Sequence, residues 1–423
     1  MWLYPQAMIC PQCGATAPNQ PGRLLLTQFL PTVPANLFES VPEPVPPLTS
    51  LSQARMSNNL DIKFSGSGSE YFRIWIVNLL LTVVTLTLYL PWARARRLRY
   101  FMGNTLVGGQ PLGFHGDPRK MFKGYLLVAV FLILYSVAGK FSPTAGFVAF
   151  VAVVVLWPAL FKSSLQFRLG NTSWRGLRFG FAGSLGGAYR AMVPLFIPGL
   201  ILLGAQVFGV DAKHPPQWYG IVAGVVVLSA LAVSPWLFWN LKQYQHNHYT
   251  FGKLQTTFSA SIGSFYLLSL KVVGLAILIL AVPFGLGFAA VNGGGSRNAA
   301  AIFAAVLLPL LGVLLGMVCI KPFAVSRLQN LVWRQTGCTE LGFESSLRFR
   351  SLLWLTLKNW LLIVLTLGFY WPFALVAMTR LRLEVMNVTS HIAPELLMAE
   401  VQASSVEAAG DAAGDFFGMD VGL

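Results

Sequence analysis

NLLLTVVTLTLYLPWA, residues Asn78 to Ala93, is nearly repeated as NWLLIVLTLGFYWPFA, residues Asn359 to Ala374. Aligned without a gap, the two segments are identical at nine of sixteen positions. Their shared Asn, Thr, Tyr and Pro residues stand at equal offsets, which apolar composition alone does not produce. We therefore expect each equivalent pair to have the same role. The candidate residues of the two copies are Asn78, Thr85, Tyr89, Pro91, Trp92, Asn359, Thr366, Tyr370 and Pro372.

The composition is typical of a membrane protein. Hydrophobic residues make up 55% of the chain and charged residues 11%, and the mean hydropathy is +0.63. A helix needs about 20 apolar residues to cross a bilayer. We predict an all-α, polytopic helical membrane protein with internal repeats and about eight transmembrane helices. The predicted spans are 75–92, 122–139, 143–160, 191–208, 218–239, 265–290, 298–320 and 352–373.

Basic residues collect in alternate loops. The loops after the first, third, fifth and seventh predicted spans are rich in Lys and Arg, whereas the other loops hold one each: Lys140, Lys213 and Arg297. Short loops rich in Lys and Arg stay in the cytoplasm. The net charge of +15 therefore describes mainly a cytoplasmic basic face, suited to anionic lipid headgroups. Nucleic acid is the other usual partner of such a charge, but these residues are spread over membrane loops, so we expect none.

The orientation of the loops leaves the topology of the two repeated segments open. Eight straight crossings with the basic loops inside place both termini outside. Alternatively, the TLTLYLP and TLGFYWP cores break a helix, and Pro91 and Pro372 begin a new one. Each segment then turns within the membrane or bends into its interface, and the termini lie inside.

The repetition extends beyond the two copies. A Pro beside an aromatic residue ends four of the spans, at Pro91, Pro158, Pro235 and Pro322. A polar pair begins thirteen residues after each: Asn104–Thr105, Asn171–Thr172, His248–Tyr249 and Gln335–Thr336. An aromatic residue followed by small or polar residues recurs at Phe64, Phe114, Phe181, Phe258 and Phe343. We interpret this as a unit of span, boundary proline, basic segment and polar turn, followed by two further helices.

The segment FSGSGSEYFRIWIVNLLLTVVTLTLYLPWARARRLRYFMGNT, followed by GFHGDPRKMFKGYLL, resembles the YjgN family of bacterial inner-membrane proteins, whose biochemical function is unassigned. The resemblance covers about Ile62 to Val388 and includes Asn78, Thr85, Tyr89 and Asn104. It implies a multi-pass inner-membrane protein and nothing catalytic. Where the family usually has Gly, this chain has Thr87, while its second copy keeps Gly368. Because Gly most easily permits a tight break, Thr87 makes such a break less expected in the first copy.

The two ends differ from the membrane domain, which we place at residues 60–388. Residues 1–59 form a Pro-rich extension predicted to be flexible. It contains one half of a zinc-ribbon pattern, Cys10 and Cys13. A structural zinc needs four ligands, so a degenerate remnant and a site between chains compete with zinc binding by a single chain. Residues 389–423 are rich in Ala, Gly and acidic residues and are predicted to be disordered.

Carboxylates are missing where chemistry would need them. All fifteen acidic residues lie outside the predicted spans, and only Asp211 lies between Pro118 and Thr339. Proton and cation pumps commonly use carboxylates within the membrane, and acid–base hydrolysis often uses a carboxylate pair. We therefore predict that the chain is no enzyme and uses no cofactor. We interpret His246 and His248 as solvated residues of the interface.

Two functional classes lead. Internal repeats and interrupted spans recur in transporters, and the absence of acidic residues suits an anionic or lipid-like solute, so a transporter- or channel-like protein is the first. The alternative is a membrane scaffold or regulatory protein that binds a membrane-protein partner through its basic face and flexible ends. The paired asparagines fit either class, because an Asn in hydrocarbon must find hydrogen-bond partners. They clamp two helices together or line a polar path.

Overall fold

The computed structural model describes residues 58–208, 210, 216–294 and 299–391. The chain divides into two units between Gln53 and Ala54, and all described residues belong to the second unit. The predictions for the Pro-rich extension, for Cys10 and Cys13 and for the acidic tail therefore fall outside the described residues. The membrane domain begins with a strand at Asn58 and ends with one at Ser390.

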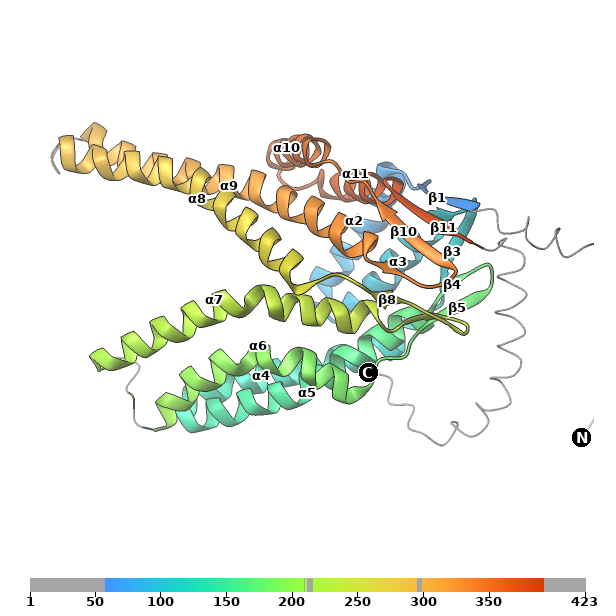
Figure 1. The fold of residues 1–423 in the computed structure, drawn as a ribbon, viewed down its shortest axis with the longest axis horizontal. Helices are drawn as coiled ribbons and strands as arrows, with labels where there is room; N and C mark the ends of the chain where they lie inside the picture. The colour runs from blue at the N-terminus through green and yellow to red at the C-terminus, as the bar shows by residue number, and fades with distance from the viewer. Residues whose placement is uncertain (1–57, 209, 211–215, 295–298, 392–423) are drawn as a thin grey trace, which may run out of the picture. The chain divides into compact units, whose positions relative to one another are not determined.

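The described helices are arranged in five antiparallel pairs along the chain (Figure 1). Six of the described helices, α4 to α9, are long and apolar enough to cross a membrane. The polytopic helical fold is thus confirmed, but the expected number of about eight spans is not. Predicted spans 75–92 and 352–373 are each divided between two shorter helices. The pairs are α2 (Gly68–Val84) with α3 (Leu90–Gly103), α4 (Pro118–Phe141) with α5 (Pro143–Gly170), α6 (Leu185–Val207) with α7 (Gln217–His246), α8 (Ile262–Gly294) with α9 (Ala299–Arg334), and α10 (Phe349–Leu365) with α11 (Trp371–Glu384).

A β-sheet joins the five helix pairs. This sheet was not predicted from the sequence. The four polar pairs interpreted as turns are instead at the starts of β2, β4, β6 and β9. Strands of two to seven residues are too short to show a clear alternation of apolar and polar side chains. The strands are β1 (Asn58–Phe64), β2 (Thr105–Val107), β3 (Gln110–Phe114), β4 (Thr172–Trp174), β5 (Leu177–Phe181), β6 (Tyr249–Phe251), β7 (Leu254–Gln255), β8 (Thr257–Phe258), β9 (Thr336–Gly337), β10 (Leu341–Ser345) and β11 (Met386–Ser390).

The sheet closes into a ring, which we call the strand ring. Its order is β7-β6-β5-β4-β3-β2-β1-β11-β10-β9-β8, and all pairs are antiparallel. The two outermost strands, β7 and β8, are separated only by Thr256, so the backbone itself joins the two edges. Buried Leu60, Trp174, Phe251 and Val388 form one apolar cluster, against which residues of five further strands pack. The centre of the strand ring is therefore filled with side chains.

One backbone hydrogen bond recurs five times and defines the repeat. The residue after a strand donates to the residue before that strand's partner: Ser65 to Asn104, His115 to Asn171, Ala182 to His248, Ser259 to Gln335 and Ser346 to Val385, at 2.9, 2.8, 2.9, 2.9 and 3.1 Å. The unit is thus a helix pair with the two strands that flank it. The aromatic position at Phe64, Phe114, Phe181 and Phe258 is buried in four units. In the fifth unit, the prediction that Phe343 occupies this position is wrong.

Strand pairing explains that difference. Phe64 pairs with Thr105, and the corresponding pair in the fifth unit is Ser345 with Met386. Phe343 lies two residues earlier and packs against the apolar cluster of the strand ring. Ser345 takes the aromatic position because hydrogen bonds hold it there: its hydroxyl donates to Asn330 Oδ1 at 2.8 Å.

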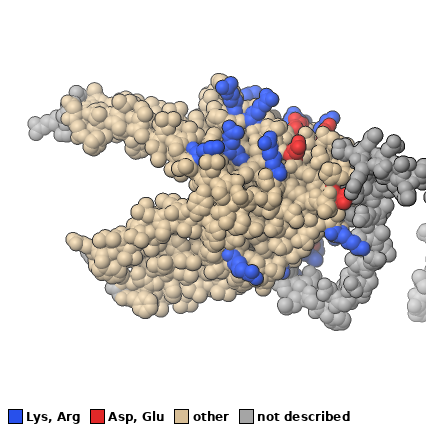
Figure 2. All heavy atoms as spheres, in the orientation of Figure 1, with Lys and Arg blue, Asp and Glu red and all other residues tan. Residues whose placement is uncertain are grey.

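The ring also decides the topology. Both ends of every helix pair lead into neighbouring strands: β1 pairs with β2 around α2–α3, and β10 pairs with β11 around α10–α11. Each of these two pairs must therefore return to the side of the membrane from which it entered. On the face shown in Figure 2, Lys and Arg lie around α10, α11 and the strands, and are missing from the projecting parts of α7, α8 and α9. We therefore place the strand ring, with Asn58 and Ser390, on the cytoplasmic side.

Cysteine labelling tests this topology. In a variant without the four native cysteines, Ser142→Cys, between α4 and α5, should react with an impermeant maleimide added outside intact cells. Arg178→Cys, in β5, should react only in inside-out vesicles. Leu86→Cys should react from neither side, because we expect this apolar turn to lie within the hydrocarbon. Labelling of Arg178→Cys in intact cells is the result that contradicts the assignment.

Candidate functional site

A threonine organises the break in each of the two short helix pairs, α2–α3 and α10–α11, which we call the interrupted hairpins. The Thr85 hydroxyl donates to the Leu81 carbonyl at 2.7 Å and accepts from the backbone N–H of Tyr89 at 3.0 Å. Thr366 does the same with Leu362 and Tyr370, at 2.6 and 2.9 Å. One side chain therefore bridges the end of the first helix and the residue that directly precedes the second. This explains the fixed spacing of Thr and Tyr in both copies.

The turn has the same backbone conformation in both copies. Leu86 and Thr87 have φ of 47° and 74°, and the equivalent Leu367 and Gly368 have φ of 49° and 95°. The tight break therefore forms at Thr87 as it does at Gly368, although Thr87 made it less expected. The Thr87 hydroxyl lies 2.9 Å from the hydroxyl of Tyr125 in α4. This hydrogen bond offsets part of the cost of a positive φ at a β-branched residue.

The Tyr and Pro of each copy fix the second helix. Tyr89 and Tyr370 are the N-cap residues that directly precede the second helices. The prolines follow within the first turn of these helices, where a missing N–H costs no helical hydrogen bond. Both prolines, Pro91 and Pro372, are buried. Trp92 packs on Tyr89 and on Phe122 of α4, with ring centroids 6.1 and 5.4 Å apart. These contacts tie the first interrupted hairpin to the neighbouring crossing helix.

The two repeated asparagines lie inside the interrupted hairpins. Asn78 and Asn359 are both buried. Asn359 Nδ2 donates to the Ala374 carbonyl of α11 at 3.4 Å, which is the contact expected of a helix clamp. Among the described residues, neither Oδ1 atom has a hydrogen-bond partner. A buried acceptor without a partner is costly, so each hairpin holds one polar atom available for another group.

The tips of the interrupted hairpins are apolar and exposed. Leu86 is 84% exposed and Leu367 is 90% exposed. At 1.5 Å per residue, the 17 residues of α2 extend about 25 Å and the 14 of α3 about 21 Å, less than the roughly 30 Å of the hydrocarbon core. Neither helix of this hairpin is therefore long enough to cross the membrane alone.

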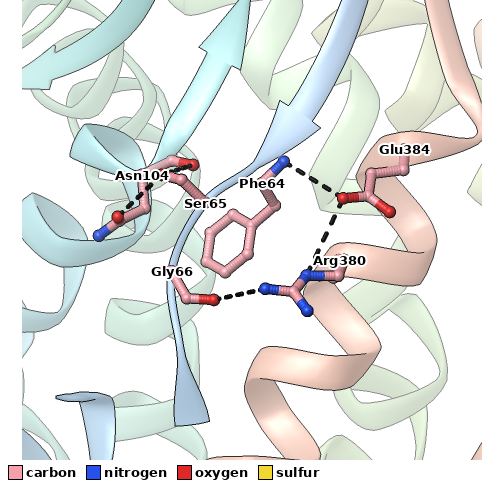
Figure 3. Close-up of polar contacts among 6 residues, drawn as sticks. All are labelled: Phe64, Ser65, Gly66, Asn104, Arg380 and Glu384. Atoms are coloured by element: carbon pink, nitrogen blue, oxygen red, sulfur yellow. Dashed lines mark hydrogen bonds and ion pairs between the residues drawn. The ribbon is translucent and has the colours of Figure 1, made fainter. Parts of the chain in front are cut away.

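Asn104 lies outside the breaks of the hairpins, between α3 and β2. Its Oδ1 accepts from the Ser65 hydroxyl at 3.0 Å (Figure 3). Nearby, Arg380 donates to the Gly66 carbonyl at 2.8 Å and lies 3.9 Å from Glu384, which accepts from the Phe64 N–H at 3.5 Å. The contacts of Arg380 and Glu384 tie α11 to the end of β1, beside the pair of β1 and β11, which no turn of the chain connects. Sequence reasoning missed Arg380 and Glu384, because their partners lie more than 300 residues away.

The same kind of contact fastens most neighbouring units together. A side chain from the second helix of one unit donates to a carbonyl just before the next helix pair. Besides Arg380 with Gly66, the pairs are Arg99 with Gly116 at 3.1 Å, Trp239 with Ala260 at 2.7 Å and Asn330 with Leu347 at 3.0 Å. Arg99 thus has a structural role in addition to its place on the basic face.

Two further side chains differ from what the sequence suggests. His246 is buried, and its Nδ1 lies 3.0 Å from the Thr336 hydroxyl, so its interpretation as a solvated residue is wrong. His248 Nδ1 lies 2.8 Å from the Tyr244 carbonyl. At the start of α2, Glu70 completes a capping box with Ser67. The hydrogen bond from Tyr100 lowers the pKa of the Glu70 carboxyl, which therefore stays ionised beside the N-terminus of the helix.

The fold and the site define a class: a multi-pass helical membrane protein in which crossing helices and interrupted hairpins are held by one ring of short strands. The chain belongs to the family described as "Bacterial protein of unknown function (DUF898)", whose sequence model matches residues 59–416. It is thereby a member of the YjgN family that the sequence resembles, and a multi-pass protein of the inner membrane.

Curated relatives carry the same name. Inner membrane protein YjgN of Salmonella typhimurium is 24% identical over 356 residues, which cover 77% of this chain and 87% of that protein. The protein of that name from Escherichia coli O157:H7 is 30% identical over 190 residues, covering 43% of this chain and 47% of its own length. The one from Escherichia coli K12 is 33% identical over 171 residues, 38% of this chain and 42% of its own. No solved structure matches the chain.

Proposed function

We propose that this protein is a transporter- or channel-like protein for an anionic or lipid-like solute, and that it performs no covalent chemistry. The observation that supports this most is the pair of interrupted hairpins, each with a buried Asn oxygen that has no partner among the described residues. Interrupted helices in equivalent repeats often form the solute site of transporters. Asn78 and Asn359 are therefore the polar groups that we assign to the path.

The route suits a solute that enters from the membrane. The apolar cluster of Leu60, Trp174, Phe251 and Val388 fills the centre of the strand ring, so we do not place the path along the ring axis. The crossing helices expose large apolar side chains on much of their surface. Their cytoplasmic ends carry Lys and Arg, which attract anionic headgroups. A molecule with an anionic head and an apolar body matches both surfaces.

Flux in liposomes tests the proposal. Purified protein in vesicles should move fluorescent phosphatidylglycerol between leaflets or release a trapped anion, and each is measured against empty vesicles. The double variant Asn78→Leu/Asn359→Leu should lower the flux by about tenfold or more, since a lost hydrogen bond to a charged group costs about 1.5–3 kcal/mol. Asn240→Leu is the matched control: this Asn of α7 donates to the Arg190 carbonyl at 3.1 Å, outside the interrupted hairpins.

Two results contradict the proposal. One is a folded protein that moves neither class of solute. The other is an unchanged flux in the double variant. If flux is absent while a membrane protein co-purifies in a fixed ratio, the scaffold alternative replaces the transporter, and the basic face becomes its contact surface.

A further inference from the structure

The strand ring has a hollow over β8, β9, β10 and β11, which are neighbours in the sheet (Figure 1). Thr257 pairs with Gly337 across β8 and β9, and Gly337 pairs with Gly342 across β9 and β10. Gly342 pairs in turn with Thr389 of β11. Residues that lie directly opposite each other share one face of a sheet. Two glycines therefore lie side by side between two threonines, and a row without side chains leaves room above it.

This face points away from the apolar centre of the strand ring. Leu341 and Phe343 of β10 pack against the central cluster. Successive side chains of a strand alternate between its two faces, so Gly342, which lies between them, faces the other way. Because we place the strand ring on the cytoplasmic side, this outer face is open to solutes of the cytoplasm.

The hollow is a cavity of about 630 Å³, within the usual range of small-molecule sites. The row of glycines and threonines lines it, together with polar and charged side chains of the same strands and of the end of α9. Among them, the Ser259 hydroxyl donates to Gln335 Oε1 at 2.7 Å. This bond fixes the amide and leaves the Nε2 donors of Gln335 for a ligand.

Arg334 and Glu344 bring opposite charges to this cavity without forming an ion pair with each other. Arg334 Nε donates to the Ser345 carbonyl at 3.0 Å, which holds the guanidinium beside the residue that directly follows Glu344. The remaining guanidinium nitrogens and the Glu344 carboxylate make no hydrogen bond or ion pair with any residue in the described part of the chain. Both charged groups therefore have donors or acceptors left for a bound molecule.

We propose that this cavity binds a small zwitterion, a molecule that carries one carboxylate and one ammonium group, as amino acids do. A guanidinium presents parallel N–H donors that match a carboxylate, and the Glu344 carboxylate accepts from an ammonium. The same two charges discriminate against other classes, because Glu344 repels simple anions, multiply charged phosphates most of all, and Arg334 repels simple cations. The cavity is separate from Asn78 and Asn359, so this binding does not depend on the proposed transport function.

Calorimetry on the full-length protein in detergent tests the proposal with three zwitterions of increasing length: alanine, 4-aminobutyrate and 6-aminohexanoate. Each is compared with the acid of the same chain that lacks the ammonium: propionate, butyrate and hexanoate. At least one zwitterion should bind, with a Kd about fivefold or more below that of its acid, the effect of one partly exposed charge pair.

Glu344→Gln should weaken the Kd for that zwitterion about fivefold and leave the Kd for its acid no weaker than in the wild type. The Glu344 side chain has no partner among the described residues, so this variant should melt at the wild-type temperature. The matched control is Glu340→Gln: this residue lies in the turn between β9 and β10 and does not line the cavity. It should change the Kd less than about twofold.

Cys338 lines the same cavity and provides a second measurement. In a variant that keeps only this one of the four cysteines, N-ethylmaleimide should react several-fold more slowly when the zwitterion is present at about ten times its Kd, since most cavities are then occupied. Arg178→Cys in the cysteine-free protein, in β5 and outside the cavity, should react at an unchanged rate. The proposal is overturned if none of the three zwitterions binds, if each acid binds as tightly as its zwitterion, or if both cysteines are slowed equally.

Discussion

Trp174→Ala should lower the free energy of unfolding by about 3–5 kcal/mol, the usual cost of removing a buried Trp side chain. Trp174 is 5% exposed and belongs to the apolar cluster at the centre of the strand ring. Its Nε1 donates to the Val107 carbonyl of β2 at 3.1 Å, and its ring lies 6.0 Å from that of Phe251 in β6. The substitution therefore leaves a cavity where several units meet, and an unpaired carbonyl beside it.

Unfolding of the purified protein in mixed detergent micelles measures this effect. Trp218→Ala is the matched control, because Trp218 is 54% exposed at the start of α7; it should cost less than about 1 kcal/mol. Equal losses in the two variants would mean that the centre of the ring is not a packed core. The strands would then contribute little to holding the helix pairs together.

The helical part of the fold follows from the sequence, and the ring does not. A run of apolar residues is sufficient to place a helix in a membrane, and the proline spacing identified the repeat. The strands are decided by pairing between distant segments: Asn58 pairs with Ser390, and Phe64 pairs with Thr105. Such pairings leave no local signal in strands this short. The polar residues at their starts therefore resembled ordinary turns.

The candidate site likewise contains residues whose role could be predicted from the sequence and residues whose role could not. Thr85, Tyr89 and Pro91 lie within seven residues of one another and shape the same turn, so their spacing predicted a helix break. The hydroxyl of Thr87, in contrast, has its hydrogen-bond partner in another helix, at Tyr125. No local pattern of the sequence reveals that contact. Asn104 was singled out because a polar pair begins thirteen residues after Pro91. It lies between α3 and β2, and its side chain accepts from the hydroxyl of Ser65, which follows β1.

Gly183→Ala should lower the free energy of unfolding by about 1–3 kcal/mol, the usual cost of overfilling a packed core. A Cβ atom at Gly183 would overlap the Phe181 ring and lie 2.8 Å from the Tyr244 hydroxyl oxygen. Neither neighbour can move freely: both rings are buried in one cluster, and the Tyr244 hydroxyl donates to the Ser184 carbonyl at 3.0 Å. The added methyl group must therefore break that hydrogen bond or shift α7.

Gly186→Ala, three residues further on, is the control that gives the opposite sign. Nothing lies within 4 Å of a Cβ atom built there, and Gly186 is in the first turn of α6. Replacing Gly by Ala in a helix stabilises by up to about 1 kcal/mol. Gly66 repeats the environment of Gly183, since its Cβ atom would lie 2.8 Å from the Phe64 ring and 2.9 Å from the Tyr100 hydroxyl. Gly66→Ala should therefore melt below the wild-type temperature, as Gly183→Ala does. A loss at Gly183 without one at Gly66 would show that the two units are alike in sequence only.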